Sequence, residues 1–313
     1  GALPEQPAGV SDLWQSYFNG WHSIGMGTSA APPPWLAAVA IAATPFLGSV
    51  KLFFAIFFFL APILMAASMH QLLKLLSKNR WLTAMSALLY AISPISISAI
   101  NGGRLSTVFI LITLPLFVIV GQNWFQIETD SWRRVFATSL FASALMAFSP
   151  IIFLVGLSLT GFTIYRDYLA SGRAVNREIF NARIYRRITV LLIPILISAP
   201  WSFELIIDPH RFLLDAGFFI SGGGPNLALL GNPGGQGSLP IWLISPLTIV
   251  LSIAIFSSTR ARFISEIGFA AILTSAILSS ISITGNGTSV RTPIYSGSTI
   301  AIATISAVCA VVV

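Results

Sequence analysis

Charged residues are scarce in this chain, and their scarcity excludes most soluble proteins. They make up 9% of the 313 residues, whereas apolar residues make up 55%. A soluble domain carries about 25% charged residues. The mean hydropathy of +0.85 points the same way. Because the chain has too little polar surface to face water, the sequence predicts an integral membrane protein of the cell membrane rather than a soluble enzyme or a disordered chain.

Cysteine and the common catalytic motifs are also nearly absent. The one cysteine, Cys309, lies in an apolar run, which excludes an intrachain disulfide framework and a paired-thiol metal site. The sequence has no GxxxxGK, HExxH, CxxC or Asp-x-Asp pattern. We therefore expect no metal site, no cofactor and no cytoplasmic nucleotide-sugar chemistry within this chain.

The excess of basic residues has an explanation in the membrane. The net charge is +7, but Lys and Arg gather on the cytoplasmic loops of membrane proteins, so a nucleic-acid partner is not predicted. A membrane-spanning helix needs about 20 mostly apolar residues. Nine segments meet that requirement, and the sequence predicts an all-α, multi-pass helix bundle with spans at about Leu52–Leu73, Trp81–Asn101, Leu105–Phe125, Trp132–Ser149, Ile151–Ala170, Arg187–Leu205, Ile241–Thr259, Ser265–Thr284 and Ser298–Val313.

Two stretches of the sequence allow more than one arrangement of helices. The uncharged run from Val135 to Tyr165 is one long kinked helix or two helices meeting at Ser149 and Pro150. Two helices place 13 of the 17 basic residues on one side of the membrane, as the positive-inside rule requires. The run Trp35–Leu47 is too short to span, so we expect an interfacial or re-entrant helix. The alternative is the first turns of a long tilted helix that continues into Leu52.

This topology places residues 1–34 and 206–240 outside the cell. Segments of this length outside regular spans are often functional. Residues 35–313 then form the multi-spanning domain. The chain begins at Gly1 and ends within an apolar run. We therefore expect it to be a piece of a longer polypeptide.

Asp12 is the candidate catalytic residue of the first exterior segment. A carboxylate there suits a general base acting on a sugar hydroxyl, although capping of a short helix is an equally good explanation of Asp12. Aromatic side chains and a histidine surround it in the sequence and are candidates for substrate binding, although Trp and Tyr also anchor helices at the membrane interface. These candidates are Trp14, Tyr17, Trp21 and His22.

Exterior cations are candidates for binding a lipid phosphate. Arg104 follows Gly102 and Gly103 in a tight turn, where a ligand can approach the backbone amides. Pairing with an exterior carboxylate explains Arg104 equally well. His210 and Arg211 are weaker candidates of the same kind. Glu204 is a ligand group or a partner for one of these cations.

The order of several short motifs resembles a known family. They are Gly9–Trp14 followed by Gly20–His22, Gly27–Thr28 before Pro32–Leu36, Leu89–Pro94 before Gly102–Thr107, Ala199–Ser202, and Asn232–Gly237. In this order the chain is similar to the membrane-spanning C-terminal part of large actinobacterial family 2 glycosyltransferases. The resemblance implies a GT-C-like helix bundle, a polyprenyl-phosphate sugar as donor and a cytoplasmic glycosyltransferase domain upstream of this chain.

The resemblance also implies a function, with alternatives. We expect the membrane part of a glycosyltransferase in cell-envelope polysaccharide or glycolipid assembly, with Asp12 as the acidic residue of the first exterior loop. The alternatives are a non-catalytic membrane scaffold and a translocator of a lipid-linked substrate. The lipid bilayer is a partner in each case.

Overall fold

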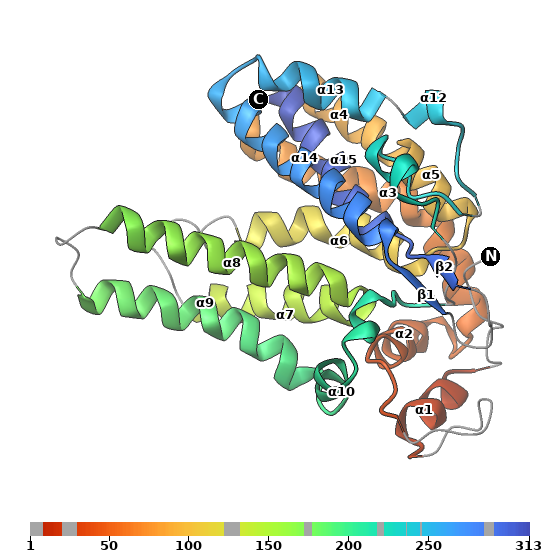
Figure 1. Ribbon diagram of the computed structural model, residues 1–313. Coiled ribbons are helices and arrows are strands. Elements are labelled where there is room, and N and C mark those ends of the chain that lie inside the picture. Colours follow the sequence, from red (N-terminus) through yellow and green to blue (C-terminus); the bar gives the residue numbers. More distant parts are fainter. Residues whose placement is uncertain are drawn as a thin grey trace.

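A computed structural model describes residues 9–20, 30–121, 132–171, 177–217, 222–235, 237–244, 246–284 and 291–313. Most of these residues are helical, which confirms the predicted helical character (Figure 1). The first half of the chain forms α1 (Val10–Phe18), α2 (Trp35–Ala43), η1 (Thr44–Phe46), α3 (Val50–Leu76), α4 (Arg80–Ala91), α5 (Pro94–Asn101), α6 (Leu105–Gly121) and α7 (Trp132–Phe148).

The second half adds further helices and one short hairpin. Strands β1 and β2 pair antiparallel, with Ile283 opposite Thr292. The sequence did not predict this two-stranded sheet. The elements are α8 (Pro150–Ser171), α9 (Arg177–Ile197), α10 (Trp201–Ile207), η4 (Pro209–Leu213), α11 (Pro225–Leu229), α12 (Ile241–Ile244), α13 (Pro246–Ile255), α14 (Thr259–Ser280), β1 (Ser282–Thr284), β2 (Arg291–Pro293) and α15 (Gly297–Val312).

Helix α15 lies at the centre of the bundle. Its buried apolar residues, including Ile300 and Ile305, belong to the largest hydrophobic cluster together with residues of α3, α4 and α6. Small residues let α14 approach α15 closely: a Cβ on Gly268 would lie 3.1 Å from the Cβ of Ser306. Close approach through small residues is the usual way in which membrane helices pack. Helix α15 is thus a central part of the largest hydrophobic cluster of the described residues.

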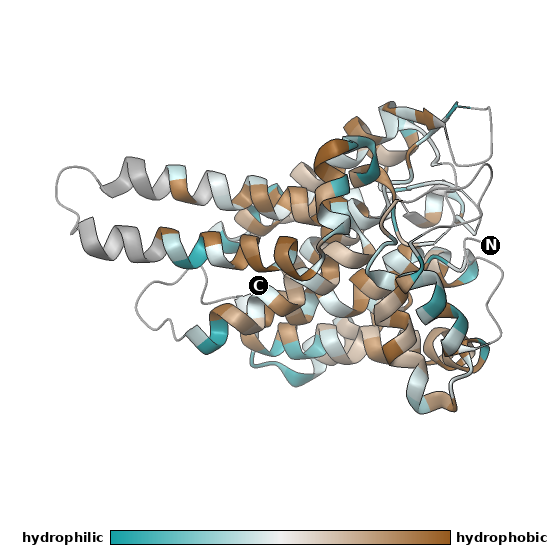
Figure 2. Cartoon of the chain, turned by 90° about the horizontal axis from the view of Figure 1, so that it is seen from below, coloured by the Kyte–Doolittle hydropathy of each residue, from teal (hydrophilic) through white to brown (hydrophobic). Residues whose placement is uncertain are grey.

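Within the residues that the structure describes, three helical stretches are long and apolar enough to cross a membrane: Val50–Leu76, Arg80–Asn101 and Thr259–Ser280. They correspond to three of the nine predicted spans. The other apolar stretches of the described residues are shorter, as at Leu105–Gly121 and Gly297–Val312, or are bent, as at Ile184–Ile197 and Trp201–Ile207, so the structure does not confirm nine spans. The large apolar side chains on the outside of the bundle fit a lipid environment, as at Phe59 (79% exposed) and Trp81 (82% exposed). Figure 2 shows hydrophobic residues along the helices and hydrophilic ones mainly near their ends.

Several predicted span boundaries differ from the structure. The predicted span Arg187–Leu205 is bent by 103° between α9 and α10, because Pro200 interrupts the helical hydrogen bonds there. In the segment Ile241–Thr259, α13 ends at Ile255, four residues before the predicted end of the span. The segment Ser265–Thr284 leaves the helix after Ser280 and enters β1.

The structure shows how the helices are arranged in both of the ambiguous stretches. Helix α7 ends at Phe148 and α8 begins at Pro150, so the uncharged run forms two helices, as predicted. Helix α2 is not the start of α3. After η1, Leu47 and Gly48 take left-handed backbone conformations with φ of 56° and 69°, which turn the chain before α3 begins. The prediction of a separate short helix is confirmed, whereas its position at the membrane interface stays a prediction.

The two ends of the bundle carry different elements. Figure 1 shows α1, α2, β1 and β2 toward the right-hand end, where the predicted exterior segments lie. The C-terminus and the far ends of α8 and α9, where the sequence predicts the cytoplasmic side, lie toward the left. We refer to the end that carries β1 and β2 as the outer end. Which side of a membrane it faces stays a prediction.

Candidate functional site

A carboxylate at the outer end of the bundle is held by three serines from separate helices. The Asp215 side chain accepts hydrogen bonds from Ser149 Oγ at 2.5 Å, Ser298 Oγ at 2.9 Å and Ser106 Oγ at 3.2 Å. Part of the Asp215 residue is exposed, but all three serines are buried. The carboxylate therefore links parts of the chain that are distant in sequence.

The three serines lie at the N-terminal ends of helices, where the backbone carries partial positive charge. Ser106 is in the first turn of α6, Ser298 is in the first turn of α15, and Ser149 immediately precedes α8. The N-terminus of a helix carries partial positive charge from its free N–H groups, so an anion is stabilised there. Three helix N-termini thus surround the Asp215 carboxylate.

Arg104 completes the charged part of the site. Its side chain is buried, with 4% exposure, and its guanidinium carbon lies 3.5 Å from the centroid of the Tyr295 ring. One guanidinium nitrogen donates to the backbone carbonyl of Gly234 at 3.5 Å. The turn that presents Arg104 is a helix C-cap: Gly103 has a φ of 63°, and Arg104 N donates to Ala99 O at 2.8 Å.

The environment shifts the acidity of Asp215. Burial raises the pKa of Asp215, because a charged carboxylate is poorly solvated there. The hydrogen bonds from Ser149, Ser298 and Ser106, and then the positive charge of Arg104, oppose this increase in the pKa. A carboxyl with a raised pKa is a stronger base once it is ionised, so Asp215 has the properties of a general base.

The glycine-rich exterior segment packs over this site by backbone contact. A Cβ on Gly234 would lie 2.2 Å from Gly223 Cα, and one on Gly237 would lie 2.7 Å from Gly102 N. Gly222 N donates to Pro293 O at 2.8 Å. The close approach at Gly102 that the sequence assigned to a ligand is therefore made by Gly237 of the same chain.

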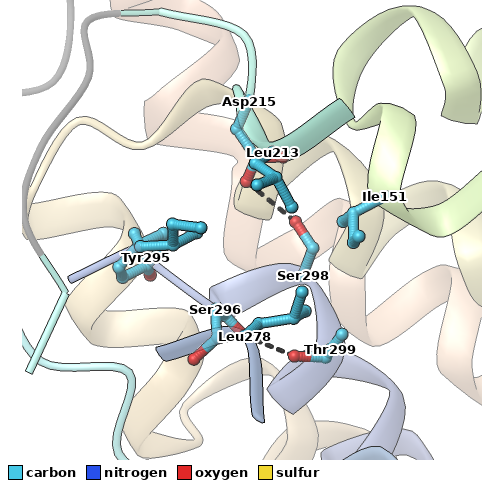
Figure 3. Close-up of a pocket in the computed structure, with 9 residues that line it drawn as sticks. Ile151, Leu213, Asp215, Leu278, Tyr295, Ser296, Ser298 and Thr299 are labelled. Carbon is cyan, nitrogen blue, oxygen red and sulfur yellow. Dashed lines mark hydrogen bonds between the residues drawn. The ribbon is translucent and has the colours of Figure 1, made fainter. Parts of the chain in front are cut away.

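A small cavity lies beside Asp215, with a volume of about 10 Å³. Figure 3 shows its lining residues, with Ser298 directed toward Asp215. The polar lining comes from Asp215, Tyr295, Ser296, Ser298 and Thr299, and the apolar lining comes from Ile151, Leu213, Leu278 and Ile294. A cavity of this volume accommodates one water-sized group.

Asp12 serves as a helix cap in the structure. It lies in the first turn of α1, where its carboxylate accepts a hydrogen bond from Gly9 N at 3.3 Å. Trp14 stacks on Phe18, with ring centroids 5.5 Å apart, and meets Tyr17 edge to face. The capping explanation of Asp12 thus has direct geometric support. The candidates Trp21 and His22 lie outside the described residues.

The remaining predicted residues form a separate ion-pair group. Arg211 pairs with Glu204 and, at 3.3 Å, with Asp208. Glu204 also accepts a hydrogen bond from Ala31 N at 2.7 Å, which joins the first exterior segment to α10. His210 lies in η4 beside Arg211. Of the two alternatives for Glu204, pairing with one of the candidate cations is confirmed, and that cation is Arg211.

The residues around Arg104 were not among the predicted site residues. Asp215 was one of several ionisable residues in the second exterior segment, and Tyr295 and Ser298 precede and begin the last apolar run. One signal distinguishes Asp215 from the other carboxylates of that segment. Asp215 stands between the apolar residues Leu213–Leu214 and Ala216. Asp208, by contrast, is separated by only one proline from the basic residues His210 and Arg211.

Comparisons with protein-family models, with curated proteins and with solved structures give no match to this chain. Among the described residues, no group of three or more His, Cys, Asp or Glu side chains is arranged to hold a metal ion. The chemistry of the site therefore has to be argued from Arg104, Asp215, Tyr295 and the serines around them.

Proposed function

We propose that this chain is the membrane part of a glycosyltransferase that acts in cell-envelope polysaccharide or glycolipid assembly. In this proposal the outer end of the bundle binds a polyprenyl-phosphate-linked sugar, and the chain is a multi-pass protein of the cell membrane with a GT-C-like fold. The observation that carries the proposal is that a buried guanidinium, Arg104, and a carboxylate, Asp215, lie near enough for their charges to interact at one end of an apolar helix bundle.

Arg104 suits the phosphate of the lipid carrier. A guanidinium carries five N–H donors in one plane and binds phosphate oxygens in pairs. The Tyr295 ring lies against the face of the Arg104 guanidinium, so any hydrogen bond that this group donates comes from the N–H groups at the edge of its plane. As the bond between the anomeric carbon and the phosphate oxygen breaks, negative charge develops on the phosphate, and a fixed cation stabilises it.

Asp215 suits the general base. The acceptor hydroxyl loses its proton to the Asp215 carboxylate while its oxygen forms the new bond to the anomeric carbon, and the lipid phosphate departs. A positioned base contributes about 10²–10⁴ to such a rate. We assign this role to Asp215 rather than to Asp12, because the Asp12 carboxylate caps α1.

A binding measurement tests the phosphate role. Native mass spectrometry of the purified chain with polyprenyl phosphate is expected to show binding that Arg104→Gln weakens at least tenfold. Arg262→Gln is the matched control, because Arg262 is an exposed arginine that pairs with Glu266 on α14. Equal affinity in wild type and Arg104→Gln would contradict the proposal.

A transfer assay tests the catalytic role. Membranes from cells that carry the intact protein are compared with membranes that carry Asp215→Asn or Asp12→Asn at equal abundance. Asp215→Asn is expected to lower glycan transfer by about 10²-fold or more, and Asp12→Asn is expected to act only through stability. Full transfer by both variants would favour the non-catalytic scaffold or the translocator instead.

A further inference from the structure

Helix α10 leaves the direction of the helix that precedes it. The chain bends by 103° between the apolar part of α9, Ile184–Ile197, and α10. A bend so near a right angle turns a helix that follows a membrane span into the plane of the membrane. Figure 1 shows α10 at the edge of the bundle, beyond the end of α9. The side of α10 that points away from the bundle therefore meets lipid, water or another protein.

The side of α10 that faces the bundle is held in place. Trp201 and Leu205 lie about one turn apart and are buried in a cluster with Met146 of α7. Ser202 Oγ donates a hydrogen bond to Ile195 O of α9 at 2.7 Å, across the bend. Packing and hydrogen bonding on this side thus decide which residues of α10 point away from the bundle.

The opposite side of α10 is apolar and exposed. Phe203, Ile206 and Ile207 are 51%, 66% and 83% exposed. Because they are spaced by three and four residues, they lie on one side of the helix. We refer to these three side chains as the apolar face of α10. Beyond Ile207 polar side chains begin, with Asp208 partly exposed and His210 exposed.

Lipid fits the apolar face better than water or protein. In water, three neighbouring apolar side chains would stay unburied. A stable protein–protein contact buries about 800 Å² on each partner, which is more than three side chains of a seven-residue helix supply. The face also continues a stripe of exposed apolar residues on α9, Ile188, Leu192 and Leu196, which has the spacing of a lipid-facing helix surface.

The length of α9 agrees with a position of α10 inside the membrane. The sequence predicts α9 as part of a span, and Arg187 is its last basic residue, ten residues before the helix ends at Ile197. Ten helical residues rise about 15 Å, whereas the hydrocarbon core is about 30 Å thick. Charged side chains lie near the edges of this core. With Arg187 near one edge, α10 lies within the opposite leaflet, where exposed apolar side chains are favourable.

We propose that α10 lies flat in the lipid leaflet at the outer end of the bundle, with its apolar face among the acyl chains and with Asp208 and His210 at the headgroups. The partner of this face is the hydrocarbon of the bilayer, so the proposal does not rest on the proposed function. It has one consequence for that function. Asp215 follows Ile207 by eight residues, and α10 therefore holds this carboxylate near the level of the lipid headgroups.

A nitroxide label on the apolar face tests the proposal. The full chain in a Cys309→Ala background carries a single labelled cysteine at Ile206, Leu196 or His210 and is placed in phosphatidylcholine nanodiscs. Electron paramagnetic resonance then measures collisions of the label with oxygen, which dissolves in hydrocarbon, and with a nickel chelate, which stays in water. Leu196 is the control for acyl contact, because it is 59% exposed on α9, and His210 is the control for the headgroup level.

The label at Ile206 is expected to behave like the label at Leu196, with several-fold fewer collisions with the nickel chelate than the label at His210. Ile207 is a second labelling site with the same expectation. If the label at Ile206 meets the chelate as often as the label at His210, the apolar face lies in water and the proposal is wrong.

A label at Ile206 that meets neither reagent would also overturn the proposal, because protein would then cover the apolar face. Broadening of the spectrum by a second label would identify that protein as another copy of this chain. These measurements involve no polyprenyl phosphate and no sugar, so their outcome is separate from the success or failure of the proposed glycosyl transfer.

Discussion

The guanidinium of Arg104 lies over the ring of Tyr295, with 3.5 Å between the guanidinium carbon and the ring centroid. Arg104 ends the turn after α5, and Tyr295 lies between β2 and α15. The pair therefore joins two regions that are almost 200 residues apart in the chain. Because a cation over an aromatic face is stabilised by the ring quadrupole, Tyr295 both holds Arg104 in place and keeps its N–H groups directed sideways.

The first prediction concerns this pair. Tyr295→Phe keeps the aromatic face and is expected to lower the free energy of unfolding by less than about 1 kcal/mol. Tyr295→Leu removes the quadrupole and is expected to cost about 1–2 kcal/mol more, because Arg104 loses its cation–π contact in a buried position. Thermal unfolding in one detergent, followed by circular dichroism, measures the difference. Equal stability of the two variants would show that the aromatic face does not hold Arg104.

The second prediction concerns the glycine beneath the Tyr295 ring. A Cβ on Gly297 would lie 2.3 Å from Tyr295 Cε1, so Gly297→Ala is expected to displace the ring and to cost about 1–3 kcal/mol of stability. Gly156→Ala is the matched control, because nothing lies within 4 Å of a Cβ at Gly156. Since alanine favours a helix over glycine by about 1 kcal/mol, Gly156→Ala is expected to be neutral or stabilising in the same unfolding assay.

The third prediction is the pH dependence of stability. Burial raises the pKa of Asp215 in the folded protein above its value in the unfolded chain. Between these two pKa values the folded state holds more protons than the unfolded state, so its stability falls as the pH rises through this window. Asp215→Asn is expected to flatten that part of the curve of melting temperature against pH. An unchanged curve would mean that Asp215 ionises in the folded protein as readily as in the unfolded chain.

The fourth prediction concerns Asp12. If its main task is to cap α1, Asp12→Ala costs about 0.5–2 kcal/mol of local stability, and Asp12→Asn costs less because an amide oxygen still accepts from Gly9 N. Hydrogen exchange of the α1 amides measures the effect. Faster exchange confined to α1, with normal exchange in α6 and α15, is expected. Equal protection in all three proteins would show that the cap contributes nothing.

The fifth prediction concerns the sides of the membrane. In a Cys309→Ala background, cysteines at Ser11 and Leu230 are expected to react with an impermeant thiol reagent added outside cells, and a cysteine at Ser257 is expected to react only after permeabilisation. All three side chains are exposed in the structure. Labelling at Ser257 from outside would invert the topology and would place the site of Arg104 and Asp215 in the cytoplasm.

Local patterns in the sequence predicted much of the fold. Long apolar runs predicted the helices, and Pro150 separated α7 from α8, because these features act through the backbone of neighbouring residues. The bend after α9 and the hairpin of β1 and β2 were missed. The bend follows Pro200, a local signal that the predicted span ran through. The hairpin depends on how the outer end packs, for example on Gly222 N donating to Pro293 O at 2.8 Å, and no local pattern encodes such a contact.

The candidate site was predicted only in part, for a reason that Asp215 illustrates. Its hydrogen-bond partners Ser106, Ser149 and Ser298 are 109, 66 and 83 residues away in the chain. Each of these serines, taken alone, resembles the many serines that pack membrane helices. Arg104 was selected because the two glycines before it are a local signal, but nothing local indicated its partners.

By itself, the sequence determined that the chain is apolar and mostly helical, because composition decides which segments can leave water. Only the tertiary structure decided which polar groups meet. It brings Arg104, Asp215 and Tyr295 together because α15, rich in small residues, passes through the centre of the bundle and presents its first turn beside those of α6 and α8. Three positive helix ends then surround one carboxylate, an arrangement that depends on packing between distant segments and on no single stretch of sequence.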